Sequence, residues 1–358
     1  MKVLVWGLGL IGGSFAKAIR NSSFIEDIYG YDTSEFTLKY AKSQGIIDNL
    51  FSLEDSFSEI DLLVIASPLD TYQMVFENIR DKVTKSDLLV MDLGSVKKYP
   101  EDLFEEVLGD KHIFIGGHPM AGSDKSGIEN SSGTLFENAV FFLTNLEKAN
   151  ENGKIIAQNI VRALGSEIVE IDSDSHDRIV SKVSHIPHIM ASLLVNNIDD
   201  GESIKFAGSG FRDTTRIASG NPNLWKDIIS NNKNHIVSEI DNMIDSLKGI
   251  KSTLVGNNLM NLVDLLEKGK RVRKELPEHL RDNMNPLYDI IIDVKDRPGV
   301  LGEVTTLLGI VKANIKQIEI LNSREGYHGA LRICFSNIED LEKAQSVLEF
   351  TNYEQVRI

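Results

Sequence analysis

The strongest constraint on the fold is a glycine-rich turn directly after a short apolar run at the start of the chain. The run is Val3–Trp6, and the six residues that follow it are Gly7, Leu8, Gly9, Leu10, Ile11 and Gly12. Glycines at this spacing allow a tight turn, a close approach of the backbone to a pyrophosphate, and close packing of a helix on a strand. The helix, expected over Gly13–Asn21, adds free N–H groups at its N-terminus. We therefore expect these six residues to bind a dinucleotide in a Rossmann-type α/β domain.

An acidic residue at the end of the second expected strand, Ile28–Tyr31, distinguishes between the two nicotinamide dinucleotides. Asp32 lies 20 residues after Gly12. A carboxylate at this place accepts hydrogen bonds from the ribose hydroxyls and repels a 2′-phosphate. The next two residues provide no arginine that could hold such a phosphate. The sequence therefore favours NAD over NADP as the cofactor.

The hydrophobic pattern of the 358 residues changes character after residue 172. Residues 1–172 alternate apolar runs with helical patterns, which is typical of βαβ units and a parallel sheet. The expected strands are Val3–Trp6, Ile28–Tyr31, Leu62–Ala66, Leu88–Met91, Ile113–Ile115, Val140–Leu143 and Glu167–Ile171. Residues 173–275 show helical periodicity instead, which predicts an all-helical domain of the kind that often carries a dimer interface. The clearest helical stretches are Ile179–Asn197, Asn223–Lys248 and Leu254–Arg273.

Strand character returns at the C-terminal end of the chain. A charged, proline-containing linker over 276–286 precedes residues 287–358. These residues show the order strand, helix, strand, strand, helix, starting at Tyr288, Gly299, Ile315, Ala330 and Asp340. A last strand near Tyr353–Ile358 would complete a small α+β domain with the order βαββαβ.

Composition excludes several other classes of protein. The net charge of −15 argues against nucleic acid, because binding to phosphates needs clustered cations. The single cysteine, Cys334, allows neither an internal disulfide nor a zinc cluster. No stretch approaches the roughly 18 apolar residues of a membrane helix. We expect a soluble, cytoplasmic protein with no metal and no membrane partner.

Polar residues follow three of the expected strands, at the sheet edge where ligands of open α/β sheets bind. Ser67 comes after Leu62–Ala66 and is grouped with the cofactor residues. Ser95 comes after the fourth strand and should face the nicotinamide, although a polar turn that caps the next helix is the alternative. His118 follows the fifth strand in a glycine-rich loop. Because oxidation of an alcohol needs a base that works near neutral pH, His118 is the expected catalytic base.

Two further segments with chemical character lie in the helical part. Helical spacing places Ser181, Ser184, His185 and His188 on one face. Pro187 is costly inside a helix and suggests a shaped site there, whereas a solvated polar face is the alternative. Arg212 and Arg216 are four residues apart, so they can share a helix face and grip a carboxylate with paired hydrogen bonds. Ion pairs that only support the helix would explain the two arginines equally well.

Taken together, these segments resemble the prephenate/arogenate dehydrogenase family of tyrosine biosynthesis over residues 1–230. The motifs that carry the resemblance are GLGLIGGS, DLGSVK, HPMAGSDKSG, SHIPH and GFRDTTRIASGNPNLW. Further along the chain, the segments 296–301 and 313–315 resemble an ACT domain, a ligand-sensing βαββαβ module found on enzymes of amino-acid metabolism.

The resemblance implies an activity and a role for each matching residue. The chain would oxidise and decarboxylate prephenate to 4-hydroxyphenylpyruvate, with His118 as base and Ser95 orienting it. The residues implied in substrate binding are Asp124, His188, Arg212, Arg216 and Trp225, the last matching an aromatic that reaches a neighbouring subunit. The residues implied in binding tyrosine as a feedback effector are Asp296, Gly299, Val300 and Asn314. The implied assembly is a homodimer.

One departure and several alternatives accompany this interpretation. Gly220 stands where the family usually has a serine, which puts the hydrogen bond of that serine in doubt. Arogenate dehydrogenase is the nearest competing activity. A β-hydroxyacid dehydrogenase would use a lysine such as Lys182, and a non-catalytic sensor of NAD and an amino acid is the alternative from another class. The ACT-like unit could also serve only as a dimerisation surface.

Overall fold

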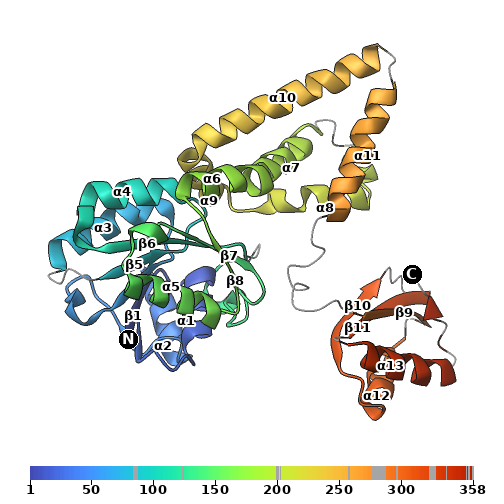
Figure 1. The fold of residues 1–358 in the computed structure, drawn as a ribbon, viewed down its shortest axis with the longest axis horizontal. Helices are drawn as coiled ribbons and strands as arrows, with labels where there is room; N and C mark the ends of the chain where they lie inside the picture. Colours follow the sequence, from blue (N-terminus) through green and yellow to red (C-terminus); the bar gives the residue numbers. More distant parts are fainter. Residues whose placement is uncertain are drawn as a thin grey trace. The chain divides into compact units, whose positions relative to one another are not determined.

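The computed structural model describes most of the chain. The described residues are 1–83, 88–122, 125–198, 201, 203–256, 259–275, 288–295, 297–321, 328–335, 337–351, 353 and 355–356. They form two compact units, Met1–Gly269 and Lys270–Ile358 (Figure 1). The expected linker over 276–286 and the expected site residues Asp124 and Asp296 lie outside the described residues.

An eight-stranded sheet forms the centre of the N-terminal part, with the strand order β3-β2-β1-β4-β5-β6-β7-β8. The strands are β1 Lys2–Trp6, β2 Asp27–Tyr31, β3 Asn49–Leu50, β4 Leu62–Ile65, β5 Leu89–Asp92, β6 Ile113–Pro119, β7 Val140–Thr144 and β8 Glu167–Glu170. All seven expected strands are present. The additional strand, β3, contains only two residues, which is too few to show a periodicity.

The expectation of a parallel sheet is wrong for one pair of strands. β7 runs antiparallel to β6, with His118 opposite Phe142, whereas the other neighbouring pairs of this sheet are parallel. A parallel pair needs a crossover connection, usually a helix. Between β6 and β7 the described residues contain only the short 3₁₀ turn Ile128–Asn130, so the chain returns from the same edge of the sheet.

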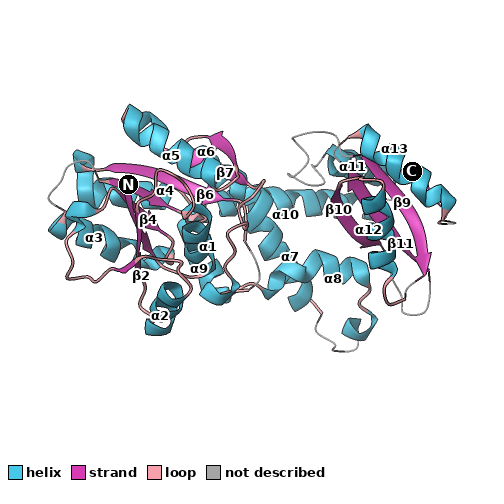
Figure 2. Ribbon diagram, turned by 90° about the horizontal axis from the view of Figure 1, so that it is seen from below, coloured by secondary structure: helices cyan, strands magenta, loops and turns pink. Residues whose placement is uncertain are grey.

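Helices pack on both faces of this sheet; Figure 2 draws the strands in magenta and the helices in cyan. The packed helices are α1 Leu10–Ile19, α2 Glu35–Ser43, α3 Tyr72–Lys82, α4 Lys98–Leu108 and α5 Glu151–Ala163. Side chains of a strand alternate between faces. Val3 and Val5 accordingly belong to the core with α1 and α5, and Leu4 and Trp6 to the core with α3 and α4. Helix α1 begins at Leu10, three residues before the expected start, because Gly9 already occupies the N-cap position.

The rest of the first unit is helical, as expected. Its helices are α6 Ser173–Val180, α7 Ile186–Asn196, α8 Ser209–Thr215, α9 Pro222–Asn231 and α10 Lys233–Val255, together with α11 Leu259–Glu275, which begins in this unit and ends in the second. The expected continuous helix Ile179–Asn197 is interrupted by a π-helical turn, Ser181–His185. This turn places Pro187 in the first turn of α7, where its missing N–H is tolerated. No helix among the described residues is long and apolar enough to cross a membrane.

The second unit is a four-stranded antiparallel sheet with the order β10-β11-β9-β12 and two helices. Its elements are β9 Tyr288–Lys295, α12 Val300–Ile310, β10 Ile315–Leu321, β11 His328–Phe335, α13 Ile338–Phe350 and β12 Gln355–Val356. The helices and the sheet share one apolar core that includes Ile292, Val304 and Leu348. The short β12 is the expected last strand, so the βαββαβ order is confirmed.

Candidate active site

The glycine turn after β1 has the geometry that a pyrophosphate site needs. Gly7 has a φ of +93°, and a Cβ atom there would lie 2.7 Å from the backbone nitrogen of Ser67. A Cβ atom on Gly12 would overlap the carbonyl oxygen of Gly7, whereas the corresponding position at Gly9 has no atom within 4 Å. No side chain caps the N-terminus of α1. Gly9 therefore leaves an open approach to the free N–H groups of this helix.

Asp32 is tied to the same turn. Its Oδ2 accepts a hydrogen bond from the backbone N–H of Leu8 at 2.8 Å, and its Oδ1 accepts one from Ser34 at 2.8 Å. Each carboxylate oxygen keeps a further lone pair for a ribose hydroxyl. Ser67 lies beside Gly7, and its hydroxyl is hydrogen-bonded to that of Thr71 at 2.7 Å. The expected cofactor residues are thus gathered at the carboxyl ends of β1, β2 and β4, with Leu10 and Ile11 opening α1.

A buried ion pair joins the ends of β5 and β6. The Lys97 ammonium lies 2.5 Å from Asp92 Oδ2 and donates to the carbonyl of Gly117 at 2.6 Å. Both side chains are fully buried. Burial raises the pKa of Asp92 and lowers the pKa of Lys97, and the attraction between them opposes both shifts. Ser95 lies on this turn, half-buried, with no hydrogen bond to another described residue.

His118 stands at the end of β6 at the head of a buried hydrogen-bonded chain. Its Nδ1 lies 2.8 Å from His176 Nε2, and His176 Nδ1 lies 2.8 Å from Asp177 Oδ1. His118 is 8% exposed, His176 0% and Asp177 1%. Burial, together with His176 and Lys97, lowers the pKa of His118 well below its usual value, so the imidazole is neutral at neutral pH. A neutral imidazole can accept a proton.

Sequence reasoning missed His176 and Asp177. Both lie in α6, His176 being 58 residues after His118, and only the fold brings them together. A histidine followed by an aspartate on the apolar face of an amphipathic helix was the available signal, because buried polar side chains need partners.

The polar face expected around Pro187 is buried rather than solvated. His185 and His188 are 1% and 6% exposed, and His188 stacks on Trp225 with ring centroids 3.6 Å apart. Asn232 donates to His185 Nδ1 at 3.1 Å. His185 Nε2 and His188 Nδ1 have no hydrogen-bond partner within the described part of the chain. Trp225, implied to reach a neighbouring subunit, therefore makes its stacking contact within its own chain.

This stack explains the departure at Gly220. A Cβ atom there would lie 2.6 Å from Trp225 Nε1 and 3.1 Å from His188 Cε1. A serine at this position would therefore displace the indole ring from His188. The stacking of Trp225 on His188 therefore depends on the absence of a side chain at Gly220.

The two expected carboxylate-binding arginines lie on the surface near this stack. Arg212 belongs to α8, and Arg216 begins the following 3₁₀ turn, which packs against α7, the helix that carries His188. Both side chains are exposed. Neither side chain has an ion pair or hydrogen bond to another residue that the structure describes. The interpretation of these arginines as helix-supporting ion pairs therefore has no support.

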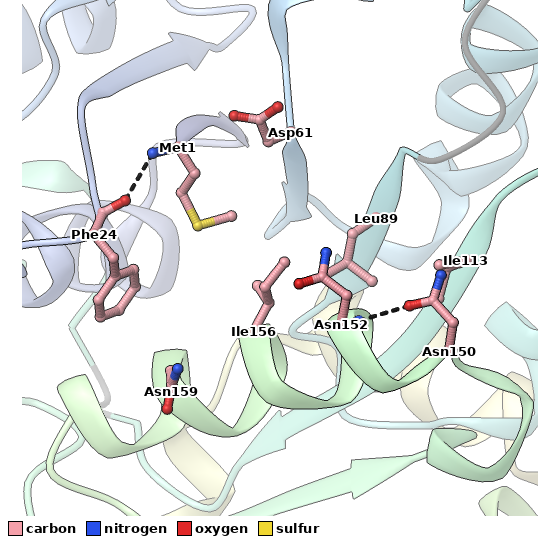
Figure 3. Close-up of a pocket in the computed structure, with 10 residues that line it drawn as sticks. Met1, Phe24, Asp61, Leu89, Ile113, Asn150, Asn152, Ile156 and Asn159 are labelled. Atoms are coloured by element: carbon pink, nitrogen blue, oxygen red, sulfur yellow. Dashed lines mark hydrogen bonds between the residues drawn. The ribbon is translucent and has the colours of Figure 1, made fainter.

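The large cavity in Figure 3 lies elsewhere. It has a volume of about 390 Å³ and is lined by Met1, Asp61, Leu89, Ile113, Ile156 and neighbouring residues of α5. Leu89 and Ile113 are the first residues of β5 and β6. The cavity therefore opens at the amino ends of the strands, opposite the edge that carries His118.

The expected effector residues are not gathered in one place. Gly299 and Val300 follow the end of β9, whereas Asn314 precedes the start of β10. In the sheet, Lys295 pairs with His328 and Ile315 with Phe335, so these positions lie at opposite ends of β11, roughly 20 Å apart. One small ligand cannot contact both positions within a single chain.

Comparisons with known proteins point in one direction. Residues 15–170 match the model of the prephenate dehydrogenase nucleotide-binding domain, residues 172–268 that of the prephenate dehydrogenase dimerization domain, and residues 288–350 that of the ACT domain. These matches confirm the expected fold class.

Individual relatives agree with the domain matches. Prephenate dehydrogenase of Bacillus subtilis (strain 168) is 35% identical over 356 residues, covering 97% of this chain and 95% of the relative. Prephenate dehydrogenase of Lactococcus lactis subsp. cremoris (strain MG1363) is 34% identical, covering 97% of both chains. The crystal structure of prephenate dehydrogenase from A. aeolicus in complex with hydroxyphenyl propionate and NAD+ is 32% identical with a TM-score of 0.71, covering 77% of this chain and 98% of that chain.

Proposed function

The chain belongs to the prephenate dehydrogenase family, and from this premise we propose that it oxidises and decarboxylates prephenate to 4-hydroxyphenylpyruvate with NAD. The observation that carries the proposal is the buried, neutral His118 at the sheet edge where the glycine turn and Asp32 also lie. This arrangement offers a base next to a dinucleotide site, as the oxidation of a ring hydroxyl requires.

The residues present fit NAD. The open side of Gly9 and the uncapped N-terminus of α1 suit the pyrophosphate, and the free lone pairs of Asp32 suit the ribose hydroxyls. The negative charge of Asp32 disfavours NADP. NAD, when bound, supplies the acceptor for the hydride that leaves the substrate carbon.

His118 would act at the ring 4-hydroxyl. Its Nε2 accepts the hydroxyl proton while hydride leaves the same carbon, and it returns the proton to the phenol oxygen of the product. The bond to the ring carboxylate breaks to release CO2, and its electron pair completes the aromatic ring. Ser95, on the turn beside His118, would orient the base. No net proton is released: the two carboxylates of prephenate and the positive nicotinamide ring sum to one negative charge, and the single carboxylate of the product carries the same charge.

The cations of the helical part would bind the substrate carboxylates. Arg216 is the main candidate because its turn packs on α7, and Arg212 lies one helical turn before it. The Nδ1 of His188 is buried and lacks an internal partner among the described residues, so a polar group of the substrate would satisfy it. Asp124 is proposed as a further substrate-binding residue on the family resemblance alone.

The alternative of a lysine-dependent β-hydroxyacid dehydrogenase loses its candidate residue. The Lys182 side chain is 54% exposed and lies 3.5 Å from Glu239. A non-catalytic sensor would not need a base held in a buried chain. Arogenate dehydrogenase uses the same groups and is decided by experiment.

We assign residues 1–172 to cofactor binding, 173–275 to substrate binding and dimerisation, and 287–358 to regulation. Apolar side chains exposed on α10 and α11 support a homodimer; they include Leu247, Leu254, Leu259, Val263 and Leu266. The ACT domain supports feedback by tyrosine, the end product. A biosynthetic role of this kind suits the cytoplasm.

The decisive test measures NADH formation by the purified full chain. Prephenate and arogenate are each supplied with NAD or NADP, with and without tyrosine. We expect turnover with prephenate and NAD, and a lower rate when tyrosine is present. Turnover confined to arogenate would refute the substrate, preference for NADP would refute the role of Asp32, and a rate unchanged by tyrosine would refute the feedback.

A further inference from the structure

We propose that His176 and Asp177 are positioning residues that hold His118 in the tautomer with a free lone pair on Nε2. The proposal rests on the proposed function, in which His118 is the base. It assigns a role to two residues that neither the motifs nor the comparisons single out.

The carboxylate of Asp177 ends the hydrogen-bonded chain that starts at His118. Asp177 Oδ1 accepts the backbone N–H of Lys97 at 2.8 Å, and Oδ2 accepts that of Lys98 at 3.0 Å. Burial raises the pKa of Asp177, and these two hydrogen bonds oppose the shift. The two backbone N–H groups stabilise the ionised carboxylate, and an ionised carboxylate has no proton to donate. The contact between Asp177 Oδ1 and His176 Nδ1 therefore requires the proton to be on Nδ1.

The tautomer of His118 follows from the chemistry of a neutral imidazole, which carries one N–H and one lone pair. With its proton on Nδ1, His176 presents a lone pair at Nε2. The 2.8 Å contact from this atom to His118 Nδ1 then requires the proton of His118 to be on Nδ1. His118 Nε2 is left without a proton, as a base needs.

His176 could fix the tautomer of His118 or carry a proton away from it, and two observations distinguish these roles. Burial lowers the pKa of His176 to about 2, so this ring stays neutral throughout turnover. The chain also ends at a buried carboxylate rather than in solvent. His176 therefore fixes the tautomer of His118 and does not relay its proton. Phe142 packs between the strand and the helix, with its ring centroid 5.1 Å from that of His176, and limits rotation of the ring.

A purely structural role is the competing explanation, because Asp177 also joins α6 to the start of α4. The two explanations differ in what a substitution at His176 should do. His176→Gln keeps both functions of the ring, since its amide oxygen can accept from His118 while its NH2 group donates to Asp177. His176→Phe keeps the ring shape and loses both hydrogen bonds.

The experiment compares these two variants in the full chain with the wild type. We expect kcat to fall about 10²- to 10³-fold in His176→Phe, with the KM for prephenate and the affinity for NAD within threefold of wild type. His176→Gln should recover most of the loss. His235→Phe is the matched control, because His235 pairs with Asp174 in an exposed histidine–aspartate contact of 3.1 Å, and its kcat should not change. Equal losses in the two His176 variants, or no loss in His176→Phe, would overturn the proposal.

A measurement on the wild type makes the test independent of folding and of turnover. The ¹⁵N resonances of the His118 ring, assigned by comparison with His118→Asn, report which nitrogen carries the proton. We expect a protonated Nδ1 and an unprotonated Nε2. The opposite tautomer would overturn the proposal even if the chain is an active prephenate dehydrogenase. The expected tautomer without turnover on prephenate or arogenate would refute the proposed function instead.

Discussion

The proposed base, His118, and the two arginines proposed to bind carboxylates, Arg212 and Arg216, differ in how the fold holds them. His118 is 8% exposed and joined to His176 and Asp177 by hydrogen bonds that end on backbone N–H groups. Arg212 and Arg216 are exposed and have no ion pair within the described part of the chain. The fold therefore fixes the side chain of His118, whereas it leaves the side chains of Arg212 and Arg216 exposed to solvent.

The two regions therefore differ in the free-energy cost of ordering their side chains when substrate binds. Fixing an arginine side chain costs up to about 2 kcal/mol of conformational entropy, which has to be met when the substrate binds. The base needs no such ordering, so its contribution is available entirely to the transition state. Damage to the buried chain should then lower kcat, and damage to the arginines should raise KM.

The largest effect is expected from removal of the base. His118→Asn removes the proton acceptor, and we expect kcat to fall about 10³-fold because general base catalysis contributes roughly 10²- to 10⁴-fold. Affinity for NAD, measured by titration, should stay within twofold, since the glycine turn and Asp32 are untouched. A kcat within tenfold of wild type would show that the buried region does not supply the base.

Substitution of the arginines should raise the KM for prephenate and leave kcat nearly unchanged. We expect Arg216→Ala to raise the KM for prephenate about 10- to 100-fold with kcat within threefold, since a charge-assisted hydrogen bond contributes roughly 1.5–3 kcal/mol. Arg212→Ala, farther from α7, should raise it less. Arg216→Lys keeps the charge and loses the paired geometry, so it should lie between wild type and alanine. A fall in kcat with unchanged KM would contradict a role of Arg216 in substrate binding and indicate a role in the chemical step.

The sequence predicted where local features lie in the fold. The glycine turn follows β1, Asp32 follows β2 and His118 lies near the end of β6, as expected from the apolar runs that precede them. The strands that are buried on both faces, such as Leu62–Ile65, could be found because they are continuously apolar.

Features that depend on tertiary contacts could not be predicted. The His118–His176 pair joins two elements 58 residues apart. The reversal of β7 and the π-helical turn before Pro187 depend on how the chain packs and not on a residue pattern. The separation of Gly299 from Asn314 follows from strand order, which the motif at each position does not encode.

A further test is possible at Gly220, which ends the 3₁₀ turn that Arg216 begins and lies against Trp225 and His188. Gly220→Ser should displace the indole ring and raise the KM for prephenate about tenfold, because the side chain would start 2.6 Å from Trp225 Nε1. Tryptophan fluorescence should change with it. Gly220→Ala is the control for the hydroxyl: an equal effect shows a steric cause, and an unchanged KM in both variants would contradict the role of the stack.

The smallest effect concerns stability at mildly acidic pH, and it distinguishes the regions without turnover. The pKa of His176 is about 2 in the folded protein, against about 6.5 when unfolded, so the unfolded state binds more protons as the pH falls through 6.5. The free energy of unfolding should therefore decrease between pH 7 and pH 6, and His176 should contribute about 0.7 kcal/mol of this decrease. In His176→Gln that contribution is lost and the pH dependence is shallower. Arg216→Ala should leave the dependence unchanged, because arginine does not titrate in this range. Denaturant unfolding at the two pH values measures all three proteins, and equal slopes in wild type and His176→Gln would mean that the buried chain does not hold His176 neutral.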